Sequence, residues 1–192
     1  GDIDMRQIMA HLQAVLPDDA IITHGAGNFA IWPNKFFKFG QEARQLGPQS
    51  GSMCFGVAAA LAAKACDPDR FVLCFAGDGD FQMNGNELGT ALQSGLNPVI
   101  LIINNSSYGT IRMHQERNYP YRVSGTDLQN PDFVGLAKSY GFYGERVEST
   151  DQFATAFDRA LQSKTGAILD LVVATEAITP RQSIADIRNA GT

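Results

Sequence analysis

The feature that constrains the fold of this chain most strongly is a Gly-Asp-Gly turn at residues 77–79. The turn lies between a strand pattern and a helix pattern. Residues 71–76, just before the turn, are apolar and β-prone, which is typical of a buried parallel strand. Residues 80–94 have apolar positions at helical spacing, and residues 98–103 form a second apolar run that ends in Asn-Asn at 104–105. The stretch therefore predicts one βαβ unit with an acid after its first strand and two amides after its second.

The rest of the chain repeats the alternation of strand and helix patterns, which predicts a single α/β domain over residues 1–192. Because 44% of the 192 residues are hydrophobic, the chain can bury a sizeable core. Apolar runs predict strands at 20–23, 144–147 and 167–173, and helical spacing predicts helices at 4–16, 51–64, 131–140 and 150–163. Residues 33–50 lack periodicity and predict a loop, and the tail from residue 179 either forms a helix or packs on a neighbouring subunit. We expect a three-layer αβα sandwich with a mainly parallel sheet.

Charge and cysteine usage exclude several classes of partner. The net charge is -5, charged residues make up 18% of the chain, and no basic stripe is present, so nucleic acid is not expected as a partner. No apolar run approaches the ~18 residues of a membrane span. Cys54, Cys66 and Cys74 each lie in an apolar neighbourhood without metal-ligand spacing. They indicate reduced, buried thiols in a cytoplasmic protein.

The predicted βαβ unit can hold a metal and a phosphate group. A right-handed crossover places both strand ends at one edge of the sheet, where α/β proteins bind ligands. Asp78 supplies an anionic oxygen, Asn105 a neutral one, and the chain just beyond can turn a main-chain carbonyl inward. Such oxygens suit Mg²⁺, and phosphate oxygens and water complete its octahedral coordination. A helix that begins near Asp80 offers free N–H groups to the phosphate. The alternative is an ordinary strand–turn–helix in which Asp78 caps the helix.

Together, Gly77-Asp78-Gly79 and Asn104-Asn105 resemble the signature of the thiamine diphosphate (ThDP) enzymes, in the branch of acetolactate synthase and pyruvate decarboxylase. The resemblance extends from about residue 19 to residue 180 and corresponds to the C-terminal, diphosphate-binding (PP) domain. It implies the ThDP-binding fold. It also implies that Asp78, Asn105 and the main-chain carbonyl of Ser107 bind Mg²⁺, with Gly79 and Asp80 beside the cofactor diphosphate.

A second glycine-rich turn, Gly-x-Gly-x-x-Ala at residues 25–30, follows the first predicted strand. On its own it matches the dinucleotide fingerprint, so an NAD-binding Rossmann module is an alternative from another class. The resemblance to ThDP enzymes instead implies a second diphosphate contact at Ala26, Gly27 and Asn28, made largely by main-chain N–H groups. Family members often carry Gln-His where this chain has Asn28-Phe29, and Phe29 cannot donate a hydrogen bond to a phosphate.

The segment that begins at Gly51 resembles the Gly-Ser-Met-Gly-Phe-Gly stretch of the family. The resemblance implies that the carbonyl of Gly51 accepts a hydrogen bond from the aminopyrimidine and that Met53 wedges beneath the cofactor. The wedge holds the cofactor bent, so that its 4'-nitrogen reaches the proton on the thiazolium C2. Cys54 stands where the family usually has Gly, which should crowd the start of the following helix without removing either contact.

Residues 106–120 are expected to run along the mouth of the site, where substrates are discriminated. Acetolactate synthases carry Gln-Trp where this chain has Met113-His114, and that Trp is tied to the choice of acceptor. His114 is either a substrate-side acid or base or a loop histidine exposed to water.

The resemblance implies an acetolactate synthase-like 2-oxo acid decarboxylase or carboligase that needs ThDP and Mg²⁺. The family activates the aminopyrimidine with a Glu from a separate PYR domain, usually on the neighbouring subunit of a dimer or tetramer. The pattern of residues 1–192 contains neither that domain nor the middle domain, so we expect the chain alone to be inactive. Two alternatives within this class are a subunit of a split decarboxylase of the sulfopyruvate or phosphonopyruvate type and a non-catalytic regulatory relative.

Overall fold

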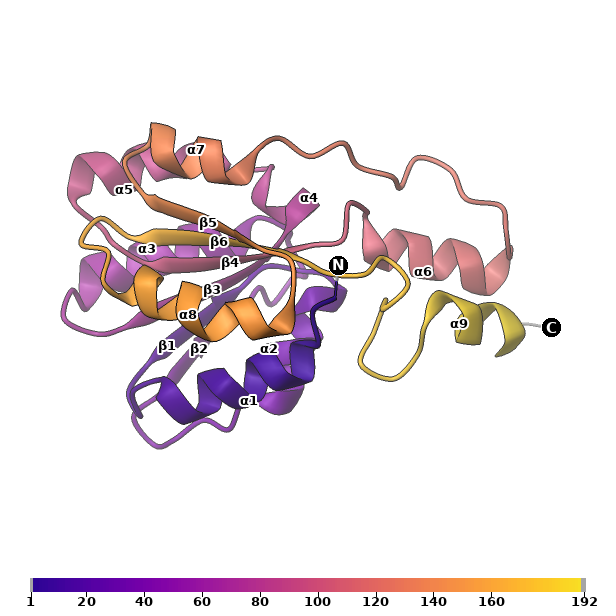
Figure 1. Ribbon diagram of the computed structural model, residues 1–192, viewed down its shortest axis with the longest axis horizontal. Helices are drawn as coiled ribbons and strands as arrows, with labels where there is room; N and C mark the ends of the chain where they lie inside the picture. Colours follow the sequence, from indigo (N-terminus) through magenta and orange to yellow (C-terminus); the bar gives the residue numbers. More distant parts are fainter. Residues whose placement is uncertain (1, 191–192) are drawn as a thin grey trace.

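A six-stranded sheet forms the centre of the computed structural model, which describes residues 2–190 (Figure 1). Every neighbouring pair of strands is parallel, in the order β2-β1-β3-β4-β6-β5. The strands are β1 Ile21–His24, β2 Arg44–Leu46, β3 Val72–Gly77, β4 Val99–Asn104, β5 Tyr143–Val147 and β6 Ala167–Val172. Gly77 at the end of β3 pairs with Ile103 near the end of β4. The polar residues that follow these two strands are thus brought to one edge of the sheet, as predicted.

Helices cover both faces of the sheet, which confirms the predicted three-layer α/β fold (Figure 1). One face packs against α1 Met5–Val15, α2 Ile31–Phe36 and α8 Thr150–Leu161. The other packs against α3 Phe55–Cys66, α5 Leu88–Ser94 and α7 Phe133–Ser139. Because both faces are covered, β3 and β4 are buried along their whole length, and this explains their continuous apolar runs.

Local sequence signals mark the ends of several helices. The side chain of Asp4 accepts a hydrogen bond from the N–H of Arg6 and caps α1. Ser149 and Gln152 form a capping box at the start of α8. Side chains such as Phe75 and Phe157, which are 0% exposed, each stabilise the fold by about 1.5–3 kcal/mol.

Two helices lie outside the sandwich, beyond the carboxyl ends of the strands. Figure 1 shows α6 Gly109–Asn118 and α9 Ile184–Ala190 next to each other at this end. Ile178, Ile184 and Ile187 form a small separate cluster, with Met113 of α6 packed against it. The tail therefore forms a helix and packs on α6 of the same chain.

The structure corrects the single helix predicted over residues 80–94. It contains instead α4 Asp78–Phe81, a 3₁₀ turn over Gly85–Glu87 and then α5. Asn84 leaves the helical region, with φ -145° and ψ 24°, and its side-chain amide donates to the carbonyl of Cys54 at 2.6 Å. A tertiary contact of this kind is invisible to helical periodicity. Because α4 is a single turn, its dipole is smaller than that of the predicted long helix.

Two further boundaries differ from the predictions. Residues 33–50, predicted as a loop, contain the end of α2 and the exposed edge strand β2, whose polar composition hides it from an apolar pattern. The helix predicted from residue 51 begins only at Phe55. Gly51 and Cys54 have φ of 68° and 66°, and this left-handed conformation cannot continue a right-handed helix.

The predicted burial of all three thiols is wrong in part. Cys74 is buried, whereas Cys54 is half-buried and Cys66 is exposed at the end of α3. Cys66 lies at a helix terminus, where apolar neighbours in the sequence do not ensure that the side chain is buried in the fold. Within residues 2–190, no helix combines the length and the apolarity needed to cross a bilayer.

Candidate cofactor site

A cavity of about 290 Å³ lies at the carboxyl ends of β3 and β4. Its walls also include apolar side chains such as Trp32, Ile103 and Ile178. Nine of the residues predicted to hold the cofactor or the metal line it: Ala26, Gly27, Asn28, Met53, Asp78, Gly79, Asp80, Asn105 and Ser107. The fold thus brings together residues that are up to 81 positions apart in the sequence, counting from Ala26 to Ser107.

Asp78 follows β3 directly and is 2% exposed. Its Oδ1 accepts a hydrogen bond from the N–H of Gly79 at 3.0 Å, and its Oδ2 accepts one from the side-chain amide of Asn130 at 2.8 Å. Burial raises the pKa of Asp78, and the hydrogen bond from Asn130 opposes that rise. Each carboxylate oxygen still has a lone pair that could reach a cation.

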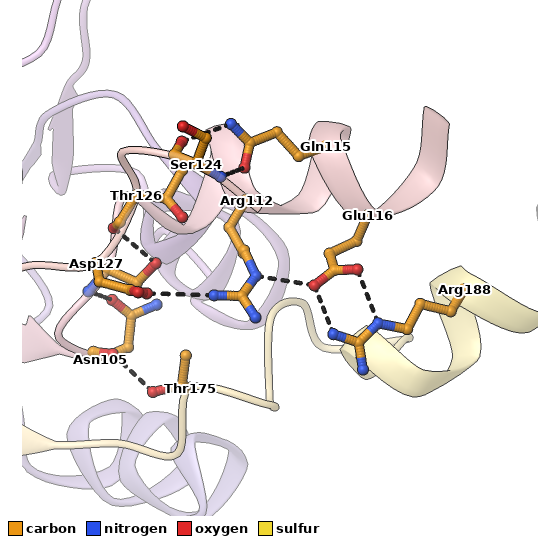
Figure 2. A network of polar contacts seen from close by, with 10 residues as sticks. Asn105, Arg112, Gln115, Glu116, Ser124, Thr126, Asp127, Thr175 and Arg188 are labelled. Carbon is orange, nitrogen blue, oxygen red and sulfur yellow. Dashed lines mark hydrogen bonds and ion pairs between the residues drawn. The ribbon is translucent and has the colours of Figure 1, made fainter. Parts of the chain in front are cut away.

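Asn105 and Ser107 are held in place by the segments around them, and Figure 2 shows Thr175 beside Asn105. Asn105 Oδ1 accepts from the N–H of Ser107 at 3.1 Å, and the hydroxyl of Thr175 donates to the carbonyl of Asn105 at 2.8 Å. The hydroxyl of Ser107 donates to the carbonyl of Thr126 at 3.1 Å. The loop after β4 is therefore anchored both to the chain after β6 and to the chain after α6.

Asp80 is a second buried carboxylate beside Asp78 and is 1% exposed. Its Oδ1 accepts from the N–H of Cys54 at 2.8 Å, and its carboxylate also interacts with the N–H of Ala26. Burial raises the pKa of Asp80 to about 6. Its Oδ2 is buried without a hydrogen-bond partner among the described residues. A buried oxygen without a partner is free to bind a water molecule, an ion or a cofactor group.

The donor set of the cavity fits a hard cation together with a diphosphate. The charged side chains that line it are Asp4, Arg6, Asp78 and Asp80, so carboxylates outnumber cations by three to one. A diphosphate alone would be repelled by this excess of negative charge, whereas a divalent cation would offset it. No group of three or more His, Cys, Asp or Glu side chains suited to a metal occurs within residues 2–190. A carboxylate, an amide and a main-chain carbonyl are instead typical of Mg²⁺, which keeps phosphate and water ligands.

Three predicted site residues lie in surroundings that do not match the roles predicted for them. The N–H of Asn28 donates to Thr110 Oγ1 at 3.0 Å and its side-chain amide donates to the carbonyl of Ile178 at 3.1 Å, so the structure does not favour donation to a phosphate. Gly51 is exposed and is not one of the cavity-lining residues. His114 lies on the exposed surface of α6, likewise outside that lining.

Sequence reasoning missed two contributors to the site. Asn130 bonds to Asp78, but Asn-Pro at residues 130–131 reads in the sequence only as the approach to a helix. Residues 177–180 form part of the cavity wall, and they are held by Asn28 and by Arg6, whose guanidinium donates to the carbonyl of Pro180 at 2.8 Å. No local pattern in the sequence predicts either contact.

Comparisons with known proteins agree with this geometry. Residues 25–171 match the family described as "Thiamine pyrophosphate enzyme, C-terminal TPP binding domain". The acetolactate synthase large subunit of Parasynechococcus marenigrum (strain WH8102) is 34% identical over 175 residues, which are 90% of this chain and 28% of that protein. Acetolactate synthase isozyme 2 large subunit of Escherichia coli (strain K12) is 33% identical over 149 residues, 77% of this chain and 27% of that protein.

A solved structure is also similar, that of the Rhodococcus jostii RHA1 thiamine diphosphate-dependent 4-hydroxybenzoylformate decarboxylase. It superposes with a TM-score of 0.81 at 31% identity, covering 90% of this chain and 33% of that one. The chain thus spans about a third or less of the length of these relatives. These comparisons favour neither the NAD-binding module nor the split decarboxylase. The chain belongs to the thiamine pyrophosphate enzymes, and it corresponds to their C-terminal TPP-binding domain.

Proposed function

We propose that this domain binds the diphosphate of ThDP through Mg²⁺, with Asp78, Asn105 and the main-chain carbonyl of Ser107 as the metal ligands. The observation that carries the proposal is that these three residues line one cavity in which carboxylates outnumber cations. The diphosphate is anionic, so its binding in such a cavity requires a cation between it and the carboxylates. Gly79 and Ala26 lie in the same wall and are suited to contacts along the diphosphate.

The other residues of the cavity then position the rest of the cofactor. Met53 lines the cavity and supports the cofactor from below. The carbonyl of Gly51, which is exposed and lies outside the lining, stays a predicted acceptor for the aminopyrimidine. Apolar side chains such as Trp32 and Ile103 exclude water, which strengthens the electrostatic interactions within the site. Bound ThDP supplies the chemistry for breaking the bond between C1 and C2 of a 2-oxo acid. This chain supplies binding and orientation.

The activity that we propose is 2-oxo acid decarboxylation or carboligation by an acetolactate synthase-like enzyme. Similarity to acetolactate synthase large subunits and to a 4-hydroxybenzoylformate decarboxylase supports this class. We propose that residues 1–192 form one PP domain, which acts with a Glu-bearing PYR domain in a dimer or tetramer. His114, on the exposed surface of α6, would meet the substrate only through that partner. The cytoplasmic location stays a prediction.

Calorimetric titration of the intact protein with ThDP tests the proposal. We expect ThDP to bind in the presence of Mg²⁺ and binding to be lost when EDTA removes the metal. Asp78→Asn should weaken Mg²⁺-dependent binding at least tenfold, because it removes the anionic ligand. Asp158→Asn, on the exposed side of α8, is the matched control and should leave binding unchanged. Equal ThDP binding with Mg²⁺ and with EDTA would contradict the proposal.

A further inference from the structure

Asn130 uses every polar atom of its side chain in the network behind Asp78. Its amide nitrogen donates to Asp78 Oδ2 at 2.8 Å and to Asn104 Oδ1 at 2.8 Å. Its carbonyl oxygen accepts from the side-chain amide of Gln82 at 2.9 Å. A flipped amide would set an oxygen against the oxygens of Asp78 and Asn104, so only one orientation satisfies all three contacts. The N–H that faces Asp78 is therefore fixed by its neighbours.

The orientation of Asn104 is fixed in turn by a buried acid. The side-chain amide of Asn104 donates to Asp170 Oδ1 at 2.9 Å, and the other oxygen of Asp170 lies 3.6 Å from a guanidinium nitrogen of Arg146. Because the carboxylate only accepts, the carbonyl of Asn104 must point away from it, toward Asn130. Asp170 is 2% exposed and Asn104 is 6% exposed. Oriented hydrogen bonds thus run from Asp170 of β6 through Asn104 of β4 and Asn130 to Asp78, and an ion pair joins Asp170 to Arg146 of the edge strand β5.

This chain of contacts lies behind the cavity. Asn130 is in the connection between α6 and α7, which Figure 1 shows as the long segment at the top of the view, and it is not one of the residues that line the cavity. Asp78 is buried, and Asn130 and Gly79 each hold one of its two oxygens through an N–H group. The N–H of Ser106 also interacts with this carboxylate. Removing Asn130 takes away the side-chain donor and its 2.8 Å hydrogen bond to Oδ2, which gives the carboxylate more freedom to rotate about its terminal bond.

We propose that Asn130 is a positioning residue that fixes the carboxylate of Asp78 for a divalent cation, and that Asn104 and Asp170 set the direction of its hydrogen bond. This inference rests on the proposed function, because it concerns the same metal ligand. Hydrogen-bonding partners of metal ligands contribute about 10–100-fold to metal affinity. The sequence assigns Asn130 no role, and the cavity lining does not include it.

Binding of Mn²⁺, measured by electron paramagnetic resonance in the presence of saturating ThDP, tests the inference on the intact protein. We expect Asn130→Ala to raise the Mn²⁺ dissociation constant about tenfold. Asn130→Ser, whose hydroxyl has one hydrogen and cannot serve both acceptors, should raise it as well and provides a second variant if the first does not fold. The control is Asn97→Ala, a half-buried amide before β4 with one hydrogen bond, to the carbonyl of Lys164 at 3.4 Å.

Thermal unfolding of the same variants separates positioning from folding. If Asn130 only held its loop in place, Asn130→Ala would lower the melting temperature while the folded protein bound Mn²⁺ as tightly as the native protein. That result would overturn the inference and leave the proposed function intact. If the native protein itself bound no Mn²⁺ with ThDP, the proposed function would be wrong and the inference would fall with it. A tenfold weaker affinity in the Asn130 variants, with Asn97→Ala unchanged, supports the inference.

Discussion

Replacing Glu116 with Gln should release the C-terminal helix α9 from the domain. Glu116 lies on α6, is 0% exposed and accepts hydrogen bonds from two arginines (Figure 2). Its Oε1 accepts from Arg112 at 3.0 Å and from Arg188 of α9 at 2.5 Å. Its Oε2 accepts from Arg188 at 2.8 Å and from the N–H of Tyr121 at 3.0 Å. Hydrogen bonds from Arg188, more than any other cause, lower the pKa of Glu116 to about 2.

The size of the effect follows from these contacts. A glutamine has one oxygen and one NH₂ group, so one end of its amide must set a donor against donors. The two guanidinium groups also lose the negative charge between them. Removing one partner of a buried ion pair costs about 3–5 kcal/mol. The apolar contacts that remain between α9 and α6 come from a small cluster around Ile184 and Ile187, so we expect the loss to be local.

Hydrogen exchange measured by mass spectrometry checks this prediction. The free energy of opening of residues 184–190 should fall by about 3–5 kcal/mol, or to zero if the docking is weaker than that, while β3 and β4 keep their protection. Low pH should act in the same direction. Because the folded pKa of Glu116 is about 2, below the usual 4.5, its contribution is complete above pH 4.5 and is lost as the pH falls toward 2. Glu148→Gln, at an exposed ion pair with Arg146, is the control. Unchanged exchange in α9 of Glu116→Gln would refute the reasoning.

Two other substitutions test the strained and buried residues of the site. Cys54→Gly should raise the free energy of unfolding by about 1 kcal/mol, because Cys54 has φ of 66° and glycine adopts that conformation without steric cost; a lower melting temperature in this variant would contradict it. Asp80→Asn should remove part of the pH dependence of the free energy of unfolding. The folded pKa of Asp80 is about 6, above the usual 3.8, so the folded state binds a proton that the unfolded state has lost between about pH 4 and 6. The native protein therefore loses stability as the pH rises through that range. Urea unfolding of the native protein and of Asp80→Asn across that range should show the two curves diverge by up to about 3 kcal/mol, and parallel curves would exclude this role for Asp80.

Features that depend on neighbours in sequence were predicted correctly. The two buried strands around Asp78 follow from apolar runs of fixed length, and the polar residues at their ends follow from the geometry of a parallel crossover. These local rules were enough to predict an α/β sandwich and to single out Asp78 and Asn105, and the resemblance to ThDP enzymes supplied the other seven of the nine residues that line one cavity. They do not extend to the boundaries of elements whose ends are decided by contacts, such as the break at Asn84 and the late start of α3.

The sequence by itself determined most of the strands and helices along the chain, though not β2, and the chemical types of the groups at the strand ends, because periodicity and turn residues act over a few positions. Only the tertiary structure decided which distant groups support them. Asn130 meets Asp78 across 52 positions, Thr175 meets Asn105 across 70, and Arg188 meets Glu116 across 72. Such pairs leave no periodic trace in the chain. Each forms only when the packing of helices on the sheet has brought a donor and an acceptor within about 3 Å, the range in which a hydrogen bond is directional.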